Sequence, residues 1–314
     1  MRSALYLPVG PGDLEFTRAV DTIESAVMYG KELTAIVVVD DSPTNRDFAA
    51  ALALPERCKL VSFPNPRCGA GYGHSGGLCV AVLAALSHIQ EATDAEFVLK
   101  LDTDSLVIGP FENEVSCGIR AHPEAGMFGV IGDAPLSDRT YRSKAQTRIL
   151  FEVALRLPQD YLCLTPDEKE TVQRFGITTE SQFQSFLHAR QLLQSAVANG
   201  YALGEYCQGG GYIVTRHLLD SMEMNGRYNA PLMWSEIHLG EDIMMALQCA
   251  AAGCCMYDMS SPDGIFTVYP STLPITIDEL ARLDTCIIHS VKGEMEQVLR
   301  AFFKQRRELE SRIT

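Results

Sequence analysis

The amino-acid sequence predicts an α/β fold with a mostly parallel sheet flanked by helices, and three observations support this class. In the first half of the chain, apolar β-branched runs alternate with stretches whose apolar residues recur at helical spacing. Strands separated by helices form βαβ units, in which the strands are parallel. The chain has 314 residues, 46% of them hydrophobic and 21% charged, which suits a single large globular domain of this class or two small ones.

The first half alternates strand and helix in a regular order. The run LTAIVVVDDS at 33–42 is continuously apolar and β-branched, as in a strand that is buried on both faces. The helix before it, 13–30, carries apolar residues at helical spacing and stops at Gly30. The predicted elements, in order, are strand 3–10, helix 13–30, strand 33–42, strand 59–66, helix 76–92 and strand 96–104.

From about residue 138 to 200 the pattern changes to polar and helix-rich, without β-branched runs, which predicts a helical insertion over the ligand edge of the sheet. Strand signals return in YCQGGGYIVT, and a helix, EDIMMALQCAAAG, follows. Short strands or loops are expected at DGIFTVYP and CIIHSVKG. The predicted divisions of the single domain are a first half at 1–135, the insertion at about 138–200, a second half at 201–293, and a C-terminal helix at 294–314.

The charge balance limits the function classes. With 26 basic and 40 acidic residues the formal net charge is −14, whereas general nucleic-acid binding requires a basic surface. We therefore expect no nucleic-acid partner. If the ligand carries phosphate, a cation has to be brought in to meet it.

The chain shows no pattern for export or membrane insertion. The apolar run in MRSALYLPVG is too short for a signal peptide, and no stretch of about 18 apolar residues suggests a transmembrane span. Ten cysteines occur without CxxC pairs, so we expect a reducing cytoplasm, no disulfide framework and no zinc site. The basic cluster Lys304, Arg306 and Arg307 in the C-terminal helix is read as a solvated helix face or as a peripheral contact with an anionic membrane surface.

Two aspartates mark the end of the fourth predicted strand. In VLKLDTDSLVIGP, Asp102 and Asp104 are two residues apart, so in a strand both carboxylates point to one face and repel each other. The segment is either a turn or a divalent-cation site. Because ligands of parallel sheets bind beyond the carboxyl ends of the strands, where Asp40 and Asp41 also lie, the metal interpretation is favoured.

A glycine-rich segment, GAGYGHSGG at 69–77, matches the spacing of a dinucleotide-binding fingerprint. It follows the third strand of the series rather than the first, and the segment is longer than a tight phosphate turn. We favour a mobile loop whose amides approach a phosphate.

Four features follow one another along the chain. In VVVDDSP, Asp41 either accepts hydrogen bonds from a nucleobase or ribose, or forms a turn or N-cap. LDTDS is the second feature. GGGYIVT and later HLGEDIMMAL form the third, in which Glu241 and Asp242 open a helix whose free amides and dipole stabilise a carboxylate. The fourth is IIHSVKG, with His289 and Lys292.

Taken in this order, the four features resemble the GT-A class of nucleotide-sugar-dependent glycosyltransferases, especially its large inverting family. In that family a strand ends in an Asp-Asp pair, a DxD motif follows, a Glu-Asp pair opens a later helix, and a late histidine completes the metal site of many members. The resemblance covers roughly residues 3–135 and 203–293. It implies a Rossmann-like GT-A fold and a transferase of the EC 2.4 type.

The resemblance also implies the roles of the donor-side residues. Asp102, Asp104 and His289 would hold Mn²⁺ or Mg²⁺, with hard carboxylate oxygens and one imidazole as ligands. Asp41 would contact the nucleobase or ribose, Asp102 would also reach the ribose or sugar, and Lys292 would assist at the diphosphate.

On the acceptor side, the resemblance makes Asp242 the general base that deprotonates an acceptor hydroxyl, with Glu241 holding the acceptor or orienting the base. His238 is the alternative base. Inversion is favoured over retention, and a UDP-sugar is favoured as donor, although Asp41 suits guanine equally well. The acceptor stays open among a saccharide, a lipid-linked molecule and a small molecule. Aromatic residues of the insertion either select the acceptor or pack a helical core: Tyr141, Phe151, Tyr161, Phe183 and Phe186.

Three other classes compete with this interpretation. A sugar-nucleotide nucleotidyltransferase would have a basic glycine-rich loop after the first strand, where this chain has LPVGPGDLEF. The interpretation as an NAD(P)-dependent oxidoreductase would be based on the spacing of the glycines at 71–76. A non-catalytic nucleotide-sugar binder would keep Asp41 and the metal acids but would not need Asp242.

Overall fold

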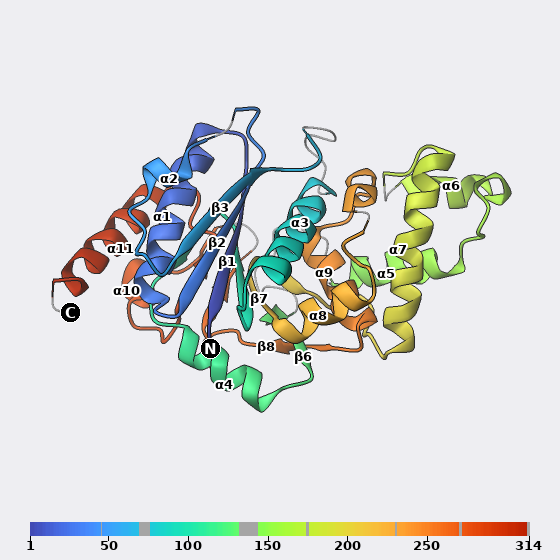
Figure 1. The fold of residues 1–314 in the computed structure, drawn as a ribbon. Helices are drawn as coiled ribbons and strands as arrows, with labels where there is room; N and C mark the ends of the chain where they lie inside the picture. The colour runs from blue at the N-terminus through green and yellow to red at the C-terminus, as the bar shows by residue number, and fades with distance from the viewer. Residues whose placement is uncertain are drawn as a thin grey trace.

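The computed structural model describes residues 1–44, 46–68, 76–131, 144–173, 176–229, 231–269 and 272–312. In these residues a seven-stranded sheet lies between helices, and a three-stranded sheet lies beside it (Figure 1). The predicted α/β class, with a mostly parallel sheet flanked by helices, is confirmed.

The main sheet has one reversed strand. Its strands lie in the order β3 (Lys59–Pro64), β2 (Leu33–Asp40), β1 (Ser3–Val9), β4 (Phe97–Leu101), β7 (Cys207–Thr215), β6 (Ala125–Ile131) and β8 (Cys255–Asp258). Neighbours pair in parallel, except that β7 runs antiparallel to both β4 and β6. The first residues of β7 therefore lie at the edge where the other strands end.

The helices connect the strands and cover both faces of the sheet. They are α1 (Asp13–Tyr29), α2 (Phe48–Ala51), α3 (Gly76–Ala92), α4 (Glu112–Ala121), α5 (Lys144–Arg156), α6 (Pro166–Gln173), α7 (Glu180–Ala198), α8 (Arg216–Met224), α9 (Glu241–Ala251), α10 (Ile277–Leu280) and α11 (Glu296–Glu310), with 3₁₀ turns at Tyr161–Cys163 and Pro231–Glu236. The predicted helices 13–30 and 76–92 are α1 and α3.

Strand alternation divides the buried residues into two cores. In β1, Ala4 and Tyr6 point to the core on the α3 side, whereas Leu5 and Leu7 point to the core on the α1 side. All four side chains are fully buried. Burying an aliphatic side chain of this size contributes about 1.5–3 kcal/mol, so these two layers position the strand ends that carry the polar residues.

Strand β6 was not predicted, and its glycines explain why. The segment AGMFGVI lacks the continuous β-branched run that marks β2. A methyl group on Gly126 would lie 2.9 Å from the sulfur of Cys249 in α9 and 2.8 Å from Cβ of Cys254. Close packing of α9 against the sheet therefore requires glycine at position 126. The β-branched residue that would have identified the strand cannot be placed there.

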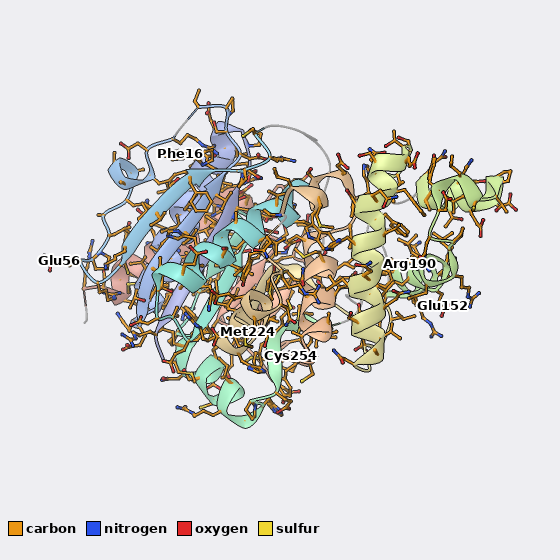
Figure 2. All side chains as sticks on the ribbon, turned by 45° about the vertical axis from the view of Figure 1, so that its right-hand side comes forward. Phe16, Glu56, Glu152, Arg190, Met224 and Cys254 are labelled. Atoms are coloured by element: carbon orange, nitrogen blue, oxygen red, sulfur yellow. The ribbon has the colours of Figure 1, made fainter. Side chains whose placement is uncertain are left out.

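The region between β6 and β7 is helical, as predicted, and projects to one side of the sheet (Figures 1 and 2). Figure 2 shows Arg190 on α7 near the neighbouring helix α5, which carries Glu152. Phe151, Phe183 and Phe186 are buried, so these aromatic residues pack a helical core rather than face an acceptor. The ring of Tyr161 lies 5.5 Å from that of Phe183, and Tyr141 lies outside the described residues.

The small sheet completes the fold beside the main one. Its strands are β5 (Ser105–Val107), β10 (Ile287–His289) and β9 (Phe266–Val268), with β10 in the middle, antiparallel to β5 and parallel to β9. Helix α11 covers one side of it through Leu299 and Phe303. Among the described residues, none of the helices has the length and apolar character that spanning a membrane requires.

Candidate metal centre and active site

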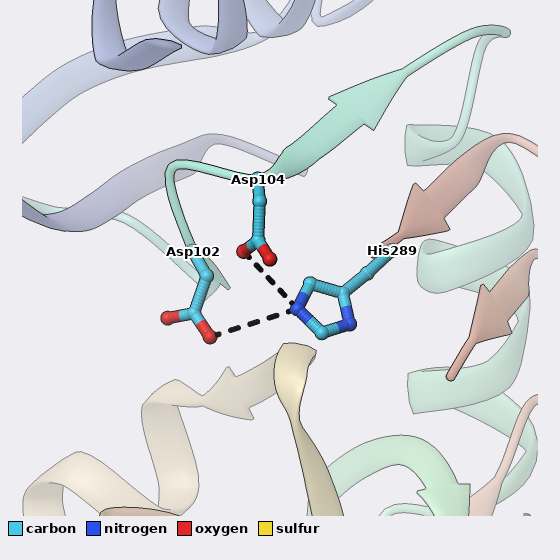
Figure 3. Close-up of side chains that lie close together, drawn as sticks. All are labelled: Asp102, Asp104 and His289. Atoms are coloured by element: carbon cyan, nitrogen blue, oxygen red, sulfur yellow. Dashed lines mark ion pairs between the residues drawn. The ribbon is translucent and has the colours of Figure 1, made fainter. Parts of the chain in front are cut away.

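Asp102, Asp104 and His289 come together at the carboxyl end of β4 (Figure 3). The two aspartates lie in the turn between β4 and β5, and His289 is the last residue of β10. Its Nε2 atom lies 3.1 Å from Oδ1 of Asp104 and 3.9 Å from Oδ2 of Asp102. One ligand atom from each residue lies within 4.8 Å of the others, which is the spacing of a metal site.

Two features of the backbone bring His289 to the aspartates. The antiparallel pairing of β10 with β5 sets His289 opposite Ser105, the residue after Asp104. The imidazole ring then lies against Gly210 of β7, where a methyl group would overlap the ring. The middle glycine of GGGYIVT, Gly210, therefore leaves room for the histidine ring.

Each aspartate presents one oxygen to His289 and has its other oxygen held by a cation. Oδ2 of Asp104 accepts hydrogen bonds from Ser290 Oγ at 2.6 Å and forms an ion pair with Lys292 Nζ at 2.8 Å. Oδ1 of Asp102 accepts from Lys100 Nζ at 2.7 Å. The carboxylates are thus oriented as single-oxygen ligands.

The electrostatics favour an ionised Asp104. Burial alone raises the pKa of this carboxyl, but His289 and Lys292 lower it well below its usual range. An ionised carboxylate, a second carboxylate and one imidazole form a ligand set that fits Mn²⁺ or Mg²⁺. These three residues would hold the ion, as the sequence predicts.

Lys100 links the metal residues to the start of α9. Its side chain is 1% exposed. The ammonium donates to Oδ1 of Asp102, pairs with Oε1 of Glu241 at 2.7 Å, and donates to the carbonyl oxygen of Gly209. Burial lowers the pKa of this lysine, but Asp102 and Glu241 outweigh burial and raise it. Two hydrogen-bond acceptors and a second carboxylate, that of Glu241, therefore surround a charged, buried ammonium group.

Sequence reasoning missed Lys100. The available signal was a single lysine within FVLKL, a strand that is otherwise apolar and buried throughout. Its strand neighbours are Tyr6 of β1 and Tyr212 of β7, and the ammonium lies 5.3 Å from the centre of the Tyr212 ring. A buried lysine needs anionic partners, so its position two residues before Asp102 could have suggested one.

Glu241 and Asp242 open α9, as predicted, and both are buried. Oδ1 of Asp242 accepts a hydrogen bond from the backbone N–H of Ile243 at 2.8 Å. Burial, and next the nearby charge of Glu241, raise the pKa of Asp242 to about 7. Burial also raises the pKa of Glu241, although Lys100 opposes it. Asp242 can therefore gain or lose a proton near neutral pH.

A cavity of about 190 Å³ opens beside the metal residues. It is lined by Pro8, Val9, Gly10, Glu15, Val39, Asp41, Asn65, Leu78, Ala81, Asp102, Thr103 and Asp104. Four of these residues carry carboxylates. Glu15 was not predicted as a site residue; it accepts a hydrogen bond from the hydroxyl of Thr103. A larger groove of about 710 Å³ lies near the amino ends of β2 and β3 and includes none of the predicted site residues.

Asp41 lies in the cavity wall, with its carboxylate paired to Arg67. Nε of Arg67 donates to Oδ1 of Asp41 at 3.1 Å. The guanidinium lies against Gly77, where a methyl group would overlap it. Asn65 donates to the carbonyl of Gly77 at 3.0 Å and so joins the two ends of the glycine-rich segment, whose residues 69–75 lie outside the described part of the chain.

The structure also places the alternative base and the basic cluster of the C-terminal helix. His238, the alternative base, packs against Gly176 in the helical region between β6 and β7. Arg307, one of three basic residues considered for a membrane contact, is buried and paired with Asp21. Arg306 pairs with Glu310 at 2.9 Å on the same helix. The predicted basic cluster is therefore largely neutralised by acids of this chain.

Comparison with protein-family models and with curated proteins gave no match. Many solved structures are similar, including the following three. The galactosyltransferase LgtC, in complex with donor and acceptor sugar analogues, has 13% identity over 97% of this chain and 95% of its own, with a TM-score of 0.46. The bifunctional glycosyltransferase WbbM, in its apo form, has 11% identity over 93% of this chain and 46% of its own, also at 0.46. An active-site mutant of LgtC has 12% identity over 96% and 94%, again at 0.46.

Proposed function

We propose that this protein is a metal-dependent glycosyltransferase that moves a sugar from a nucleoside-diphosphate sugar, with UDP favoured, to a hydroxyl acceptor with inversion at the anomeric carbon. The observation that carries the proposal is the convergence of Asp102, Asp104 and His289, with both aspartates lining the cavity. Their role as ligands of Mn²⁺ or Mg²⁺ is part of the proposal.

The charge of the cavity supports the need for a cation. Glu15, Asp41, Asp102 and Asp104 all line it, and a diphosphate brings further negative charge. Bound Mn²⁺ or Mg²⁺ would neutralise the charge that builds up on the leaving nucleoside diphosphate. Lys292, whose side chain is 48% exposed, would contact the same phosphates.

The cavity wall suggests how the nucleoside is held. Asp41 and Arg67 form a hydrogen-bonded pair there, so together they offer acceptors and donors to a base or ribose. The apolar residues Val9, Val39 and Leu78 line the same cavity and suit the face of a base or ribose. Asp102 would reach the ribose or sugar.

Asp242 is the proposed general base. A carboxylate with a pKa of about 7 is suited to accept the proton of an acceptor hydroxyl at neutral pH. The acceptor oxygen would attack the anomeric carbon as the bond to the diphosphate breaks. Glu241, fixed by Lys100, would hold the acceptor or orient Asp242.

The first test is ligand-induced stabilisation. Thermal unfolding would be followed with UDP, GDP, CDP and NAD, each with and without Mn²⁺. We expect stabilisation by UDP that requires Mn²⁺. Stabilisation by NAD without metal would contradict the proposal and favour an oxidoreductase.

Turnover separates an enzyme from a binder. We expect slow hydrolysis of the donor with Mn²⁺ that is lost in Asp104→Ala. Tight donor binding without turnover under any acceptor would identify a non-catalytic binder, and formation of a nucleotide sugar from a sugar phosphate would identify a nucleotidyltransferase. The anomeric configuration of the product, measured by NMR, tests inversion; retained configuration would remove Asp242 from the role of base.

A further inference from the structure

The C-terminal helix α11 packs along α1 and reaches the turn that carries the DxD motif (Figure 1). Several ion pairs join the two helices. Arg18 of α1 donates through Nε to Oε1 of Glu296 at 2.6 Å. Arg300 of α11 pairs with Oδ2 of Asp21 at 2.7 Å and donates through Nε to Glu296 at 3.0 Å.

Arg300 has one contact beyond this helix pair. Its Nη2 atom donates to the carbonyl oxygen of Thr103, the central residue of the motif, at 2.8 Å. The hydroxyl of Thr22 donates to the same oxygen at 3.1 Å. The Arg300 side chain is only 14% exposed, so this contact is shielded from water.

The other carbonyls of the motif are held as well. The carbonyl of Asp102 accepts from the N–H of Ser105 at 3.0 Å, and that of Asp104 accepts from the N–H of Val291 at 2.9 Å. These two bonds come from the backbone of β5 and of the segment after β10. The carbonyl of Thr103, between the two carboxylates, is held by side chains alone in the described structure, and one of them comes from the C-terminal helix.

We propose that Arg300 is a positioning residue for the metal site, so that α11 is a functional part of that site. By holding the carbonyl of Thr103, Arg300 fixes the turn from which Asp102 and Asp104 project. The inference rests on the proposed metal-dependent function. Groups that orient metal ligands without touching the ion commonly change metal affinity by about 10–100-fold when they are removed.

The same helix supplies a matched control. Arg307 also lies on α11, is also buried, and also pairs with Asp21, through Oδ1. The described structure shows Arg307 bound to Asp21 and shows Arg300 bound both to Asp21 and to Thr103. Both Arg300→Met and Arg307→Met remove an ion pair with Asp21. Arg300→Met also removes the ion pair with Glu296, and it alone releases the turn.

The experiment measures Mn²⁺ affinity from the electron paramagnetic resonance signal of free Mn²⁺, and it measures the unfolding temperature without metal. We expect Arg300→Met to weaken Mn²⁺ binding about tenfold or more. Arg307→Met, which also loses an ion pair with Asp21, should lower the unfolding temperature and keep the wild-type affinity for Mn²⁺. Arg300→Lys, which keeps the charge but cannot reach three partners at once, should fall between wild type and Arg300→Met and serves if Arg300→Met does not fold.

The outcomes separate the two proposals. If the wild-type protein shows no saturable Mn²⁺ binding, the proposed function fails, and the inference fails with it. If the wild type binds Mn²⁺ and the variants at positions 300 and 307 all bind it equally well, the metal site stands and the positioning role of Arg300 is overturned.

Discussion

Two pairs of acids lie at the ligand edge of the sheet, and their environments are opposite. Asp104 of the pair Asp102–Asp104 contacts His289 and Lys292, and its pKa is lowered. Asp242 of the pair Glu241–Asp242 has a backbone amide as its hydrogen-bond donor, and its pKa is raised to about 7. Nearby cationic side chains keep Asp104 ionised, while burial prepares Asp242 to exchange a proton.

Removing Asp104 should have the largest effect. We expect Asp104→Asn to abolish Mn²⁺ binding and donor turnover, because the amide loses the charge that offsets the cation. Calorimetric titration with Mn²⁺ would measure the affinity, and circular dichroism would check the fold. Metal-dependent turnover in a folded Asp104→Asn protein would show that the first pair is not the metal pair.

Asp242→Asn should lower kcat by about 10²–10⁴-fold, the usual contribution of a general base, while Mn²⁺ affinity stays near that of the wild type. A loss of kcat without a loss of Mn²⁺ affinity would show that the pair Glu241–Asp242 acts on the acceptor. Steady-state kinetics beside the same Mn²⁺ titration test it. A parallel loss of metal affinity would place Asp242 in the metal site.

Lys100 connects the two pairs, so Lys100→Met should disturb both. Removing one partner of a buried ion pair commonly costs about 3–5 kcal/mol in the free energy of unfolding. The double variant Lys100→Met with Glu241→Gln should recover part of that loss, because it leaves fewer buried charges unpaired. Urea unfolding of the wild type and of these two variants measures this, and a double variant less stable than Lys100→Met would contradict the pairing.

The pH dependence should follow from the raised pKa of Asp242. A base works when deprotonated, so the rate should rise about tenfold per pH unit below 7 and level off above it. For stability the sign is reversed: a folded pKa raised above its unfolded value favours folding at low pH, and this contribution is lost as pH rises from about 4 to 7. Asp242→Asn should abolish both dependences, measured by pH–rate profiles and by urea unfolding at each pH.

Lys292→Met should have the smallest effect. Because this side chain is half-exposed, its ion pair with Asp104 contributes about 0–1 kcal/mol to the free energy of unfolding. We expect a severalfold rise in the KM for the donor with little change in stability. An unchanged KM would show that Lys292 does not face the phosphates.

The sequence was informative where one local pattern determines the structure. A continuous β-branched run predicted β2, short apolar segments predicted β1 and β3, and the alternation of strands with helices placed the acids at one edge. Strand β6 escaped because packing against α9 requires glycine at 126. The partners of Lys100 and Arg300 could not be read from the sequence, because Glu241 and Thr103 reach them only after distant segments have packed.

The three glycines of β7 differ in how strictly they are required. A side chain at Gly210 would displace the imidazole of His289, whereas one at Gly209 would come within 3.2 Å of Glu241 and one at Gly211 within 3.2 Å of Leu101. In a library that varies all three codons, tolerance to alanine should therefore be lowest at the middle position. Substitution of Gly210 would then be constrained as strongly as substitution of the acids that line the site.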